Sequence, residues 1–257
     1  MPIAPTVIVY HGVGTVASER DPYHLVLPLD AFEWQMAYLA RHRQVVPLES
    51  IVGGHVPSGP PAVAITFDDG FRSVLTHAAP ILRRYGFPAT LFVPTTWIGN
   101  VMGWEPQPTS AVPLEIMSVD EIGACERLGY EIGSHGHAHA PMTAMSASEA
   151  AADLAASMER LSVVLGHPPR YLAYPWGMQS GTVRAAAQRA GFEAAFSINQ
   201  VADGRYGRER VAIRRSDPRP VFVAKTSGRY MRFRMSFIPR ATLRLLLPVL
   251  DWYRQRH

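Results

Sequence analysis

Short runs of apolar and β-branched residues alternate along the chain with longer segments in which apolar residues recur every three or four positions. The short runs predict strands, and the longer segments predict amphipathic helices. The predicted strands cover residues 6–12, 62–67, 89–94, 130–134, 170–175, 194–198 and 210–216. The predicted helices cover residues 30–43, 73–86, 118–129, 146–166 and 180–191. This alternation is typical of parallel β/α units, which form either a barrel or an open doubly wound sheet.

Capping signals mark the ends of several predicted helices. Ser118 and Ser146 are each followed three residues later by a glutamate, which is the pattern of a capping box. Asp30 precedes the first helix in the same way. Gly86 and Gly166 stand where helices are expected to stop.

Polar residues follow the predicted strands and favour the barrel. Asp68 and Asp69 end one strand, Ser134 and His135 end another, and the turn 174–177 ends a third. A β/α barrel builds its site from several such carboxyl ends. A doubly wound nucleotide binder would instead carry a Gly-rich phosphate turn after its first strand, and "YHGVG" matches that turn poorly.

The length of the chain fits one large globular domain or two small ones. The chain has 257 residues, of which 47% are hydrophobic, enough for a sizeable core. Residues 97–117 contain glycine and proline without clear periodicity, so we expect a long β/α loop over the site rather than a linker. We therefore expect a single domain over 1–257.

The single cysteine, Cys125, excludes an intramolecular disulfide. No charged segment followed by an apolar segment stands at the N-terminus, and no apolar run reaches the length of a membrane span. These features lead us to expect a cytoplasmic protein.

The net charge of +4 is distributed unevenly. From Arg205 onward, thirteen arginines and one lysine face three acidic residues, so this segment carries +11 and the rest of the chain −7. Its last part, about 226–257, is basic and amphipathic, which suits peripheral contact with the inner face of the cytoplasmic membrane. The alternative is a closing helix that packs Leu243, Leu246, Leu247 and Leu250 on the barrel. Nucleic-acid binding is not expected, because Cys/His finger spacing and basic strands with interleaved aromatic residues are both missing.

The stretch "EIGSHGHAHA" is a candidate metal site. It places His135, His137 and His139 after a strand, and an H-x-x-x-H pair with one carboxylate is a ligand set of catalytic zinc. Of Asp68 and Asp69, one carboxylate could bind the ion and the other act as a base. The alternatives are surface histidines and an Asp pair that caps the following helix.

The motifs "TFDDG", "EIGSHGHAH" and "YLAYPWG" resemble, in this order, those of the polysaccharide deacetylases, also called the NodB-homology domain or carbohydrate esterase family four. The segments "YHGV", "PILRRYGFPATLFV" and "ERVAIRRSD" are similar to the branch of exopolysaccharide amino-sugar N-deacetylases. The resemblance implies a distorted (β/α) barrel, with a permuted motif order in that branch. It also implies a divalent ion, usually Zn²⁺, with Co²⁺, Ni²⁺, Fe²⁺ or Mn²⁺ as alternatives.

The resemblance also implies residue roles. Asp69, His135 and His139 become the metal ligands and Asp68 the general base, whereas His137 has no ligand counterpart. Gly136 stands where the family has a hydroxyl-bearing residue that braces the loop.

Two departures from the family pattern need substitutes. Ala173 occupies the position of the arginine that orients the base, so Arg210 becomes the candidate, with a solvated surface arginine as the alternative. No histidine of a C-terminal motif is present to act as the acid. His11 at the end of the first strand is the candidate acid, and the alternative is a structural histidine that bonds a neighbouring loop.

The predicted function is removal of an N-acetyl or other N-acyl group from an amino sugar in a glycan or in a lipid- or nucleotide-linked saccharide. The backbone N–H of Trp176 is expected to stabilise the oxyanion. Tyr174 and Trp176 are expected to wall the acyl or sugar site, although either could belong to the core. The alternative function is a catalytically weak or inactive carbohydrate-binding barrel.

Overall fold

A closed barrel of parallel strands forms the centre of the computed structural model, which describes residues 4–106, 108–198, 200, 202 and 204–230. Each barrel strand pairs with the next one in the order β1 (Thr6–Tyr10), β10 (Arg208–Ala212), β9 (Ala194–Ile198), β8 (Tyr171–Ala173), β7 (Glu131–Ser134), β6 (Ala89–Val93) and β5 (Ala62–Phe67). β5 pairs with β1 again, with Tyr10 opposite Phe67, and this pairing closes the barrel. The predicted barrel is therefore confirmed.

Three short strands lie outside this ring. β4 (Gln44–Val45) pairs with the first residues of β5. β2 (Gly12–Gly14) and β3 (Val26–Pro28) form a separate parallel pair directly after β1.

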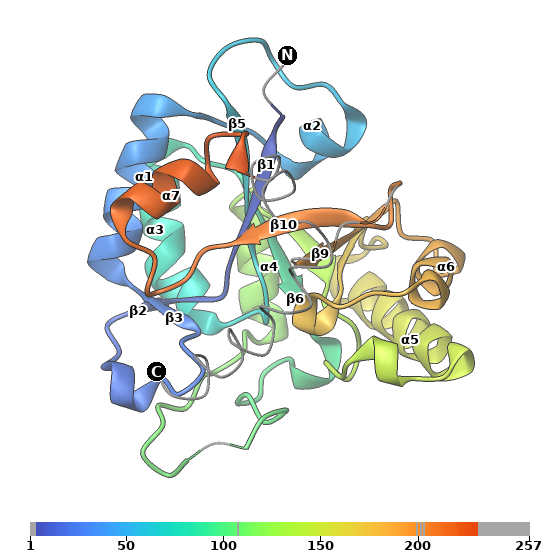
Figure 1. The fold of residues 1–257 in the computed structure, drawn as a ribbon. Coiled ribbons are helices and arrows are strands. Elements are labelled where there is room, and N and C mark those ends of the chain that lie inside the picture. The colour runs from blue at the N-terminus through green and yellow to red at the C-terminus, as the bar shows by residue number, and fades with distance from the viewer. Residues whose placement is uncertain (1–3, 107, 199, 201, 203, 231–257) are drawn as a thin grey trace, which may run out of the picture.

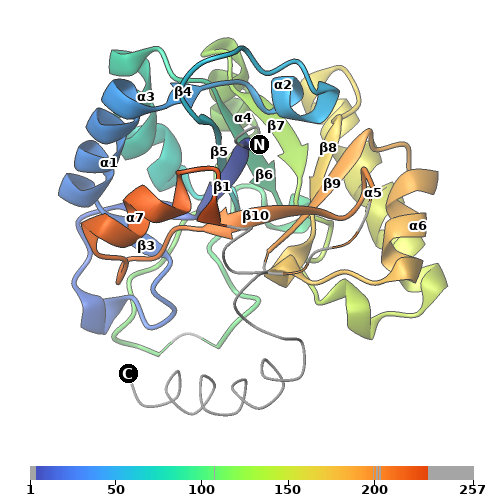
Figure 2. The same ribbon diagram turned by 45° about the horizontal axis from the view of Figure 1, so that its top comes forward.

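Helices surround the barrel on its outer face. The α-helices are α1 (Leu29–His42), α2 (Leu48–Gly53), α3 (Ala79–Tyr85), α4 (Val119–Arg127), α5 (Ala147–Leu165), α6 (Gly181–Arg189) and α7 (Arg219–Lys225). The π-helical turn η2 (Val74–Ala78) leads into α3, and the 3₁₀ turns are η1 (Ser18–Arg20), η3 (Thr95–Trp97), η4 (Met142–Ala144) and η5 (Pro175–Gly177). Both views in Figures 1 and 2 show α1 and α3 on one side of the barrel and α5 and α6 on the other.

Most predicted helix boundaries are confirmed. Both capping boxes form, because the hydroxyls of Ser118 and Ser146 accept backbone N–H groups and the glutamates reach back. Asp30 is not a cap, because α1 begins one residue earlier, after Pro28, whose backbone is already extended (ψ 141°). The Asp30 carboxylate instead accepts the N–H of Ala31. The sequence did not predict the short helices α2 and α7.

Side chains of the barrel strands alternate between two hydrophobic cores. Ile8 and Tyr10 of β1 and Ile65 of β5 pack outward against the surrounding helices. Ala64 and Phe92 belong to the inner core of the barrel. Because side chains alternate along a strand, every second residue points inward, which explains why these strands read as continuous apolar runs.

Among the described residues, no helix combines the length and the apolar character that crossing a membrane requires. Residues 231–257 lie outside the described part of the chain. The expectations for the basic segment 226–257, including its leucine stripe and the single domain over 1–257, stay predictions.

Candidate metal centre and active site

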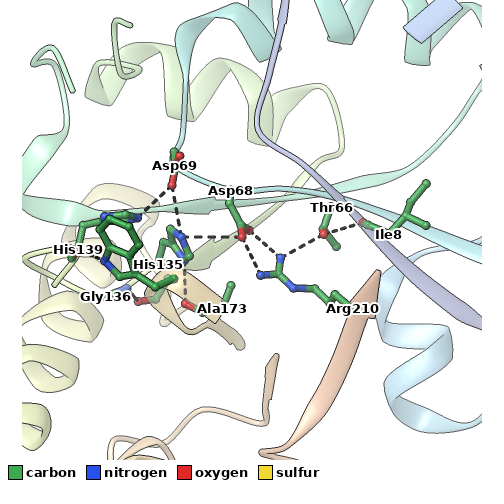
Figure 3. A network of polar contacts seen from close by, with 11 residues as sticks. Ile8, Thr66, Asp68, Asp69, His135, Gly136, His139, Ala173 and Arg210 are labelled. Carbon is green, nitrogen blue, oxygen red and sulfur yellow. Dashed lines mark hydrogen bonds and ion pairs between the residues drawn. The ribbon is translucent and has the colours of Figure 1, made fainter. Parts of the chain in front are cut away.

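The polar residues singled out in the sequence lie around the carboxyl ends of the barrel strands. Figure 3 shows Asp68 and Asp69 after β5, His135 after β7, and Arg210 on β10, all directed toward a common centre. These groups come from segments far apart in the chain, and the closed barrel brings them together.

The turn after β5 begins with a strand-like hydrogen bond and continues through two residues with left-handed backbone. The N–H of Asp68 donates to the carbonyl of Tyr10 at 2.9 Å, which continues the pairing of β5 with β1. Asp69 (φ +68°) and Gly70 (φ +64°) both adopt left-handed backbone conformations. Aspartate tolerates this conformation better than most residues, and such strain is concentrated at functional sites.

His135 and His139 meet at one oxygen of Asp69. The Nε2 atom of His139 lies 3.1 Å and that of His135 lies 3.4 Å from Oδ1 of Asp69. The Nδ1 atom of His135 lies 2.8 Å from the carbonyl oxygen of Ala173. Since a carbonyl only accepts, Nδ1 carries a proton. Nε2 faces Asp69, to which it donates when protonated, and its lone pair becomes available to a metal when it is deprotonated.

The chemistry of this donor set fits a divalent metal. Asp69, His135 and His139 each offer one ligand atom, and these atoms lie within 4.8 Å of one another. All three residues are buried. Two imidazole nitrogens and one carboxylate oxygen are ligands that catalytic zinc uses.

His137 faces away from this group. Its Nδ1 atom lies 2.8 Å from the hydroxyl of Thr95. It does not belong to the three-residue group, in keeping with the resemblance, which gives it no ligand counterpart.

Arg210 binds the carboxylate of Asp68 inside the barrel. The guanidinium donates to both carboxylate oxygens, at 2.6 and 2.7 Å, and to the hydroxyl of Thr66 at 3.2 Å. Its side chain is fully buried (0% exposed) and lies over the ring of Phe92. The alternative of a solvated surface arginine is therefore wrong.

The charges of the site keep both carboxylates ionised. Burial by itself would raise the pKa of Asp68, but the charge and hydrogen bonds of Arg210 outweigh it and lower this pKa. Burial would likewise raise the pKa of Asp69, but hydrogen bonds from His135 and His139 hold it far below its usual range.

A pocket of about 270 Å³ opens over these groups. His11 lies half-buried in its wall, in the same lining as Asp68, Asp69 and His135. Within the described ranges, the imidazole of His11 has no hydrogen-bond partner, so nothing described favours the alternative of a structural loop contact.

Tyr174 does not line the site, so its prediction as a substrate residue is wrong. Its side chain is fully buried among residues of α5 and α6, and its hydroxyl donates to the carbonyl of Tyr206 at 2.9 Å. Because Ala173 belongs to the inner core of the barrel, the alternation along the strand turns its neighbour Tyr174 outward.

Trp176 does line the pocket. It is 43% exposed, has a left-handed backbone (φ +63°), and donates from Nε1 to the carbonyl of His139 at 3.2 Å. Its ring therefore forms part of the wall beside the three candidate metal ligands.

The loop 97–117 contributes residues that the sequence did not single out. As predicted, this loop lies over the site, and Met102, Trp104 and Glu105 line the pocket. The ring of Trp104 lies 4.1 Å from that of His139. Tyr23, from the segment between β2 and β3, completes this rim. A loop without periodicity carries no signal of which side chains face the site.

Comparison with known proteins identifies the family. The family model "Polysaccharide deacetylase" matches residues 55–195. The chain is 27% identical over 150 residues to the poly-β-1,6-N-acetyl-D-glucosamine N-deacetylase of Staphylococcus aureus, which covers 55% of this chain. It spans about half (49%) of the length of that relative.

Solved structures share the fold. The Streptococcus pyogenes deacetylase PplD, solved with acetate, superimposes with a TM-score of 0.74 at 19% identity, covering 88% of this chain and 99% of PplD. IcaB from Ammonifex degensii gives 0.71 at 22% identity, covering 89% and 97%. With the family match over more than half of its residues, this chain belongs to the polysaccharide deacetylase family.

Proposed function

We propose that this protein is a metal-dependent hydrolase that removes the N-acetyl group from an amino sugar in a glycan. The observation that carries the proposal is the convergence of Asp69, His135 and His139 beside Asp68, which Arg210 holds. A base next to a ligand set, without being part of it, is what hydrolysis at a metal requires.

Asp69, His135 and His139 would hold the ion. Zn²⁺ is the first candidate, because three protein ligands of these types leave a position open in its coordination sphere. Co²⁺, Ni²⁺, Fe²⁺ and Mn²⁺ are the other candidates. When bound, the ion would supply Lewis-acid chemistry, with stabilisation of charge on the carbonyl oxygen and a lowered pKa for the attacking water.

Asp68 acts as the general base in this proposal. Arg210 keeps its carboxylate ionised and aims it, so that it can take the proton of the attacking water. The fully buried arginine on β10 thus performs the orienting role for which Ala173 has no side chain.

His11 acts as the general acid. It shares the pocket with Asp68 but lies outside the ligand group, and an imidazole can deliver a proton to a leaving amine near neutral pH. The backbone N–H of Trp176 is the candidate donor to the oxyanion.

The aromatic rim favours a sugar ring as the substrate. Trp104 and Trp176 flank His139, and indole rings offer flat apolar faces on which a pyranose can stack. The name of the S. aureus relative makes N-acetylglucosamine polymers the first substrates to test. Nothing in the described site favours the alternative of an inactive barrel, because Asp68 and the three candidate ligands are all in place.

Mass spectrometry of candidate substrates tests this proposal. Metal-loaded protein is incubated with β-1,6- and β-1,4-linked N-acetylglucosamine oligomers and with lipid- and nucleotide-linked N-acetyl sugars. We expect loss of one or more acetyl groups from the oligomers, and none with the Asp69→Ala variant. Absence of acetyl loss from every substrate with each of the five metals would overturn the proposed function. A cytoplasmic location, and contact of residues 226–257 with a membrane, stay predictions.

A further inference from the structure

The segment 136–139, which leads from the candidate ligand His135 to the candidate ligand His139, is held by hydrogen bonds from other parts of the chain. Each of its carbonyl groups accepts a hydrogen bond from η3 or η5. The pairs are Gly136 O with Thr95 N (3.1 Å), His137 O with Thr96 N (3.0 Å), Ala138 O with Trp97 Nε1 (3.3 Å) and His139 O with Trp176 Nε1 (3.2 Å).

The amide side of the same segment is held by one carboxylate. Asp153, on α5, accepts the N–H of His137 through Oδ1 at 2.8 Å and the N–H of Ala138 through Oδ2 at 2.9 Å. Hydrogen bonds to an ionised acceptor are stronger than those between neutral groups. Two successive backbone N–H groups around one anion form a concave nest, so Asp153 fixes the orientation of both peptide units.

The backbone of this segment needs such support. Gly136 (φ +75°) and His139 (φ +58°) are both left-handed. A β carbon at position 136 would lie 2.9 Å from Cε of Met142 and 3.1 Å from Oδ1 of Asp153, so the segment fits closely against α5. A left-handed backbone is strained for a histidine and persists only where its surroundings determine it.

We propose that Asp153 is a positioning residue of the metal centre. It does not belong to the three-residue ligand group, and it acts through the peptide units of His137 and Ala138. By fixing these units, it sets the direction in which His139 faces Asp69 and His135. Gly136, within the same segment, has no side chain that could fix these peptide units. This inference rests on the proposed metal site.

The test compares metal affinity in matched variants. Asp153→Asn keeps the shape but replaces one acceptor by an NH₂ group that would face a backbone N–H. We expect its Zn²⁺ affinity, measured by competition with a chelator, to fall about 10–100-fold, the usual effect of losing an outer contact of a ligand. The visible spectrum of the Co²⁺-loaded protein should change as well. Asp153→Glu, which retains both acceptors, should recover part of the affinity.

Glu159→Gln is the control, because Glu159 is exposed on the same helix. Glu159→Gln should match the wild type in Zn²⁺ affinity and in the cobalt spectrum. The melting temperature of metal-free Asp153→Asn should be close to that of metal-free Glu159→Gln. An Asp153→Asn variant with unchanged Zn²⁺ affinity and an unchanged cobalt spectrum would overturn the inference. A wild-type protein that binds no metal would instead overturn the proposed function.

A second measurement decides the matter if Asp153→Asn does not fold. In the metal-free wild type, the amides of His137 and Ala138 should be protected from hydrogen exchange. Exchange of both amides at the rate of an unstructured peptide would show that the carboxylate does not hold the segment, and the inference would fail.

Discussion

The guanidinium of Arg210 binds both carboxylate oxygens of Asp68, at 2.6 and 2.7 Å, although the two residues are 142 positions apart in the chain. Both side chains are almost completely buried, since Arg210 is 0% and Asp68 1% exposed. A bidentate pair fixes the orientation of the carboxylate as well as its charge. The catalytic competence of Asp68 is therefore expected to depend on a residue from the last strand of the barrel.

Replacing Arg210 by lysine tests this dependence. Lysine provides a point charge and cannot reproduce the planar double contact, so the pKa of Asp68 should rise toward its usual value. Because the base must be ionised, the acidic limb of the pH–rate profile should move to higher pH, and kcat/KM at neutral pH should fall on the order of tenfold to a hundredfold. Arg214→Lys, at an exposed position just beyond β10, is the control.

The same pair has a consequence for stability. The pKa of Asp68 is lower in the folded than in the unfolded chain, so the pair stabilises the fold above the unfolded pKa of about 3.9. This stabilisation is lost as the pH falls toward the folded-state pKa.

An acidic limb of the pH–rate profile that stays in place in Arg210→Lys would contradict the role of Arg210 in orienting Asp68.

Substitutions of the adjacent residues Asp68 and Asp69 should have different effects. Asp68→Asn should retain the metal, since Asp69 still binds it, but lower kcat by a factor on the order of a hundred or more. Asp69→Asn should weaken metal binding directly. Metal content by elemental analysis, together with kcat, distinguishes the two. Equal loss of metal in both variants would show that the division of roles is wrong.

Metal binding should depend on His139 and not on His137. We expect about one divalent ion per chain, loss of activity on chelation and recovery when the metal is restored. His139→Ala should remove the ion. His137→Ala should keep it, because that imidazole contacts Thr95 and lies outside the ligand group. Full metal content in His139→Ala would contradict the site assignment.

The role of His11 can be tested with leaving groups. His11→Ala should leave metal content unchanged and slow turnover most for substrates with poorly leaving amines. Activated aryl esters need little protonation on departure, so they should be affected less. His55→Ala, at an exposed position, is the control. An equal loss for both substrate types would indicate a structural role for His11.

Substitution of Tyr174 should affect stability and substitution of Trp176 should affect catalysis, although the two residues are only two positions apart. Tyr174→Phe removes the hydrogen bond to Tyr206 and should lower the free energy of unfolding by about 1 kcal/mol, with kcat/KM unchanged. Trp176→Ala removes part of the pocket wall and should lower kcat/KM. Denaturant unfolding and steady-state kinetics check both. A fall in kcat/KM for Tyr174→Phe would show that Tyr174 contributes to the site after all.

Local features of the sequence were enough to predict the barrel and the segments that bear its site. Strand length, helix periodicity and the capping boxes at Ser118 and Ser146 depend on neighbouring residues only. The placement of Asp68, Asp69 and the histidines after apolar strands follows from the same local order. Because parallel strands end at one rim of the barrel, their convergence could be expected from the sequence alone.

The partners of these residues were decided by the tertiary structure. Which arginine meets Asp68 depends on barrel closure and on the register of β10, and spacing along the chain does not encode either. Side chains alternate along a strand, but the sequence does not say which of two neighbours points into the barrel. In the structure Ala173 belongs to the inner core, so Tyr174 points outward. The hold of Asp153 on the histidine segment depends on how α5 packs against it. Local sequence thus determined where the reactive groups lie along the chain, whereas long-range packing determined what orients them, because those contacts join segments that meet only in the folded barrel.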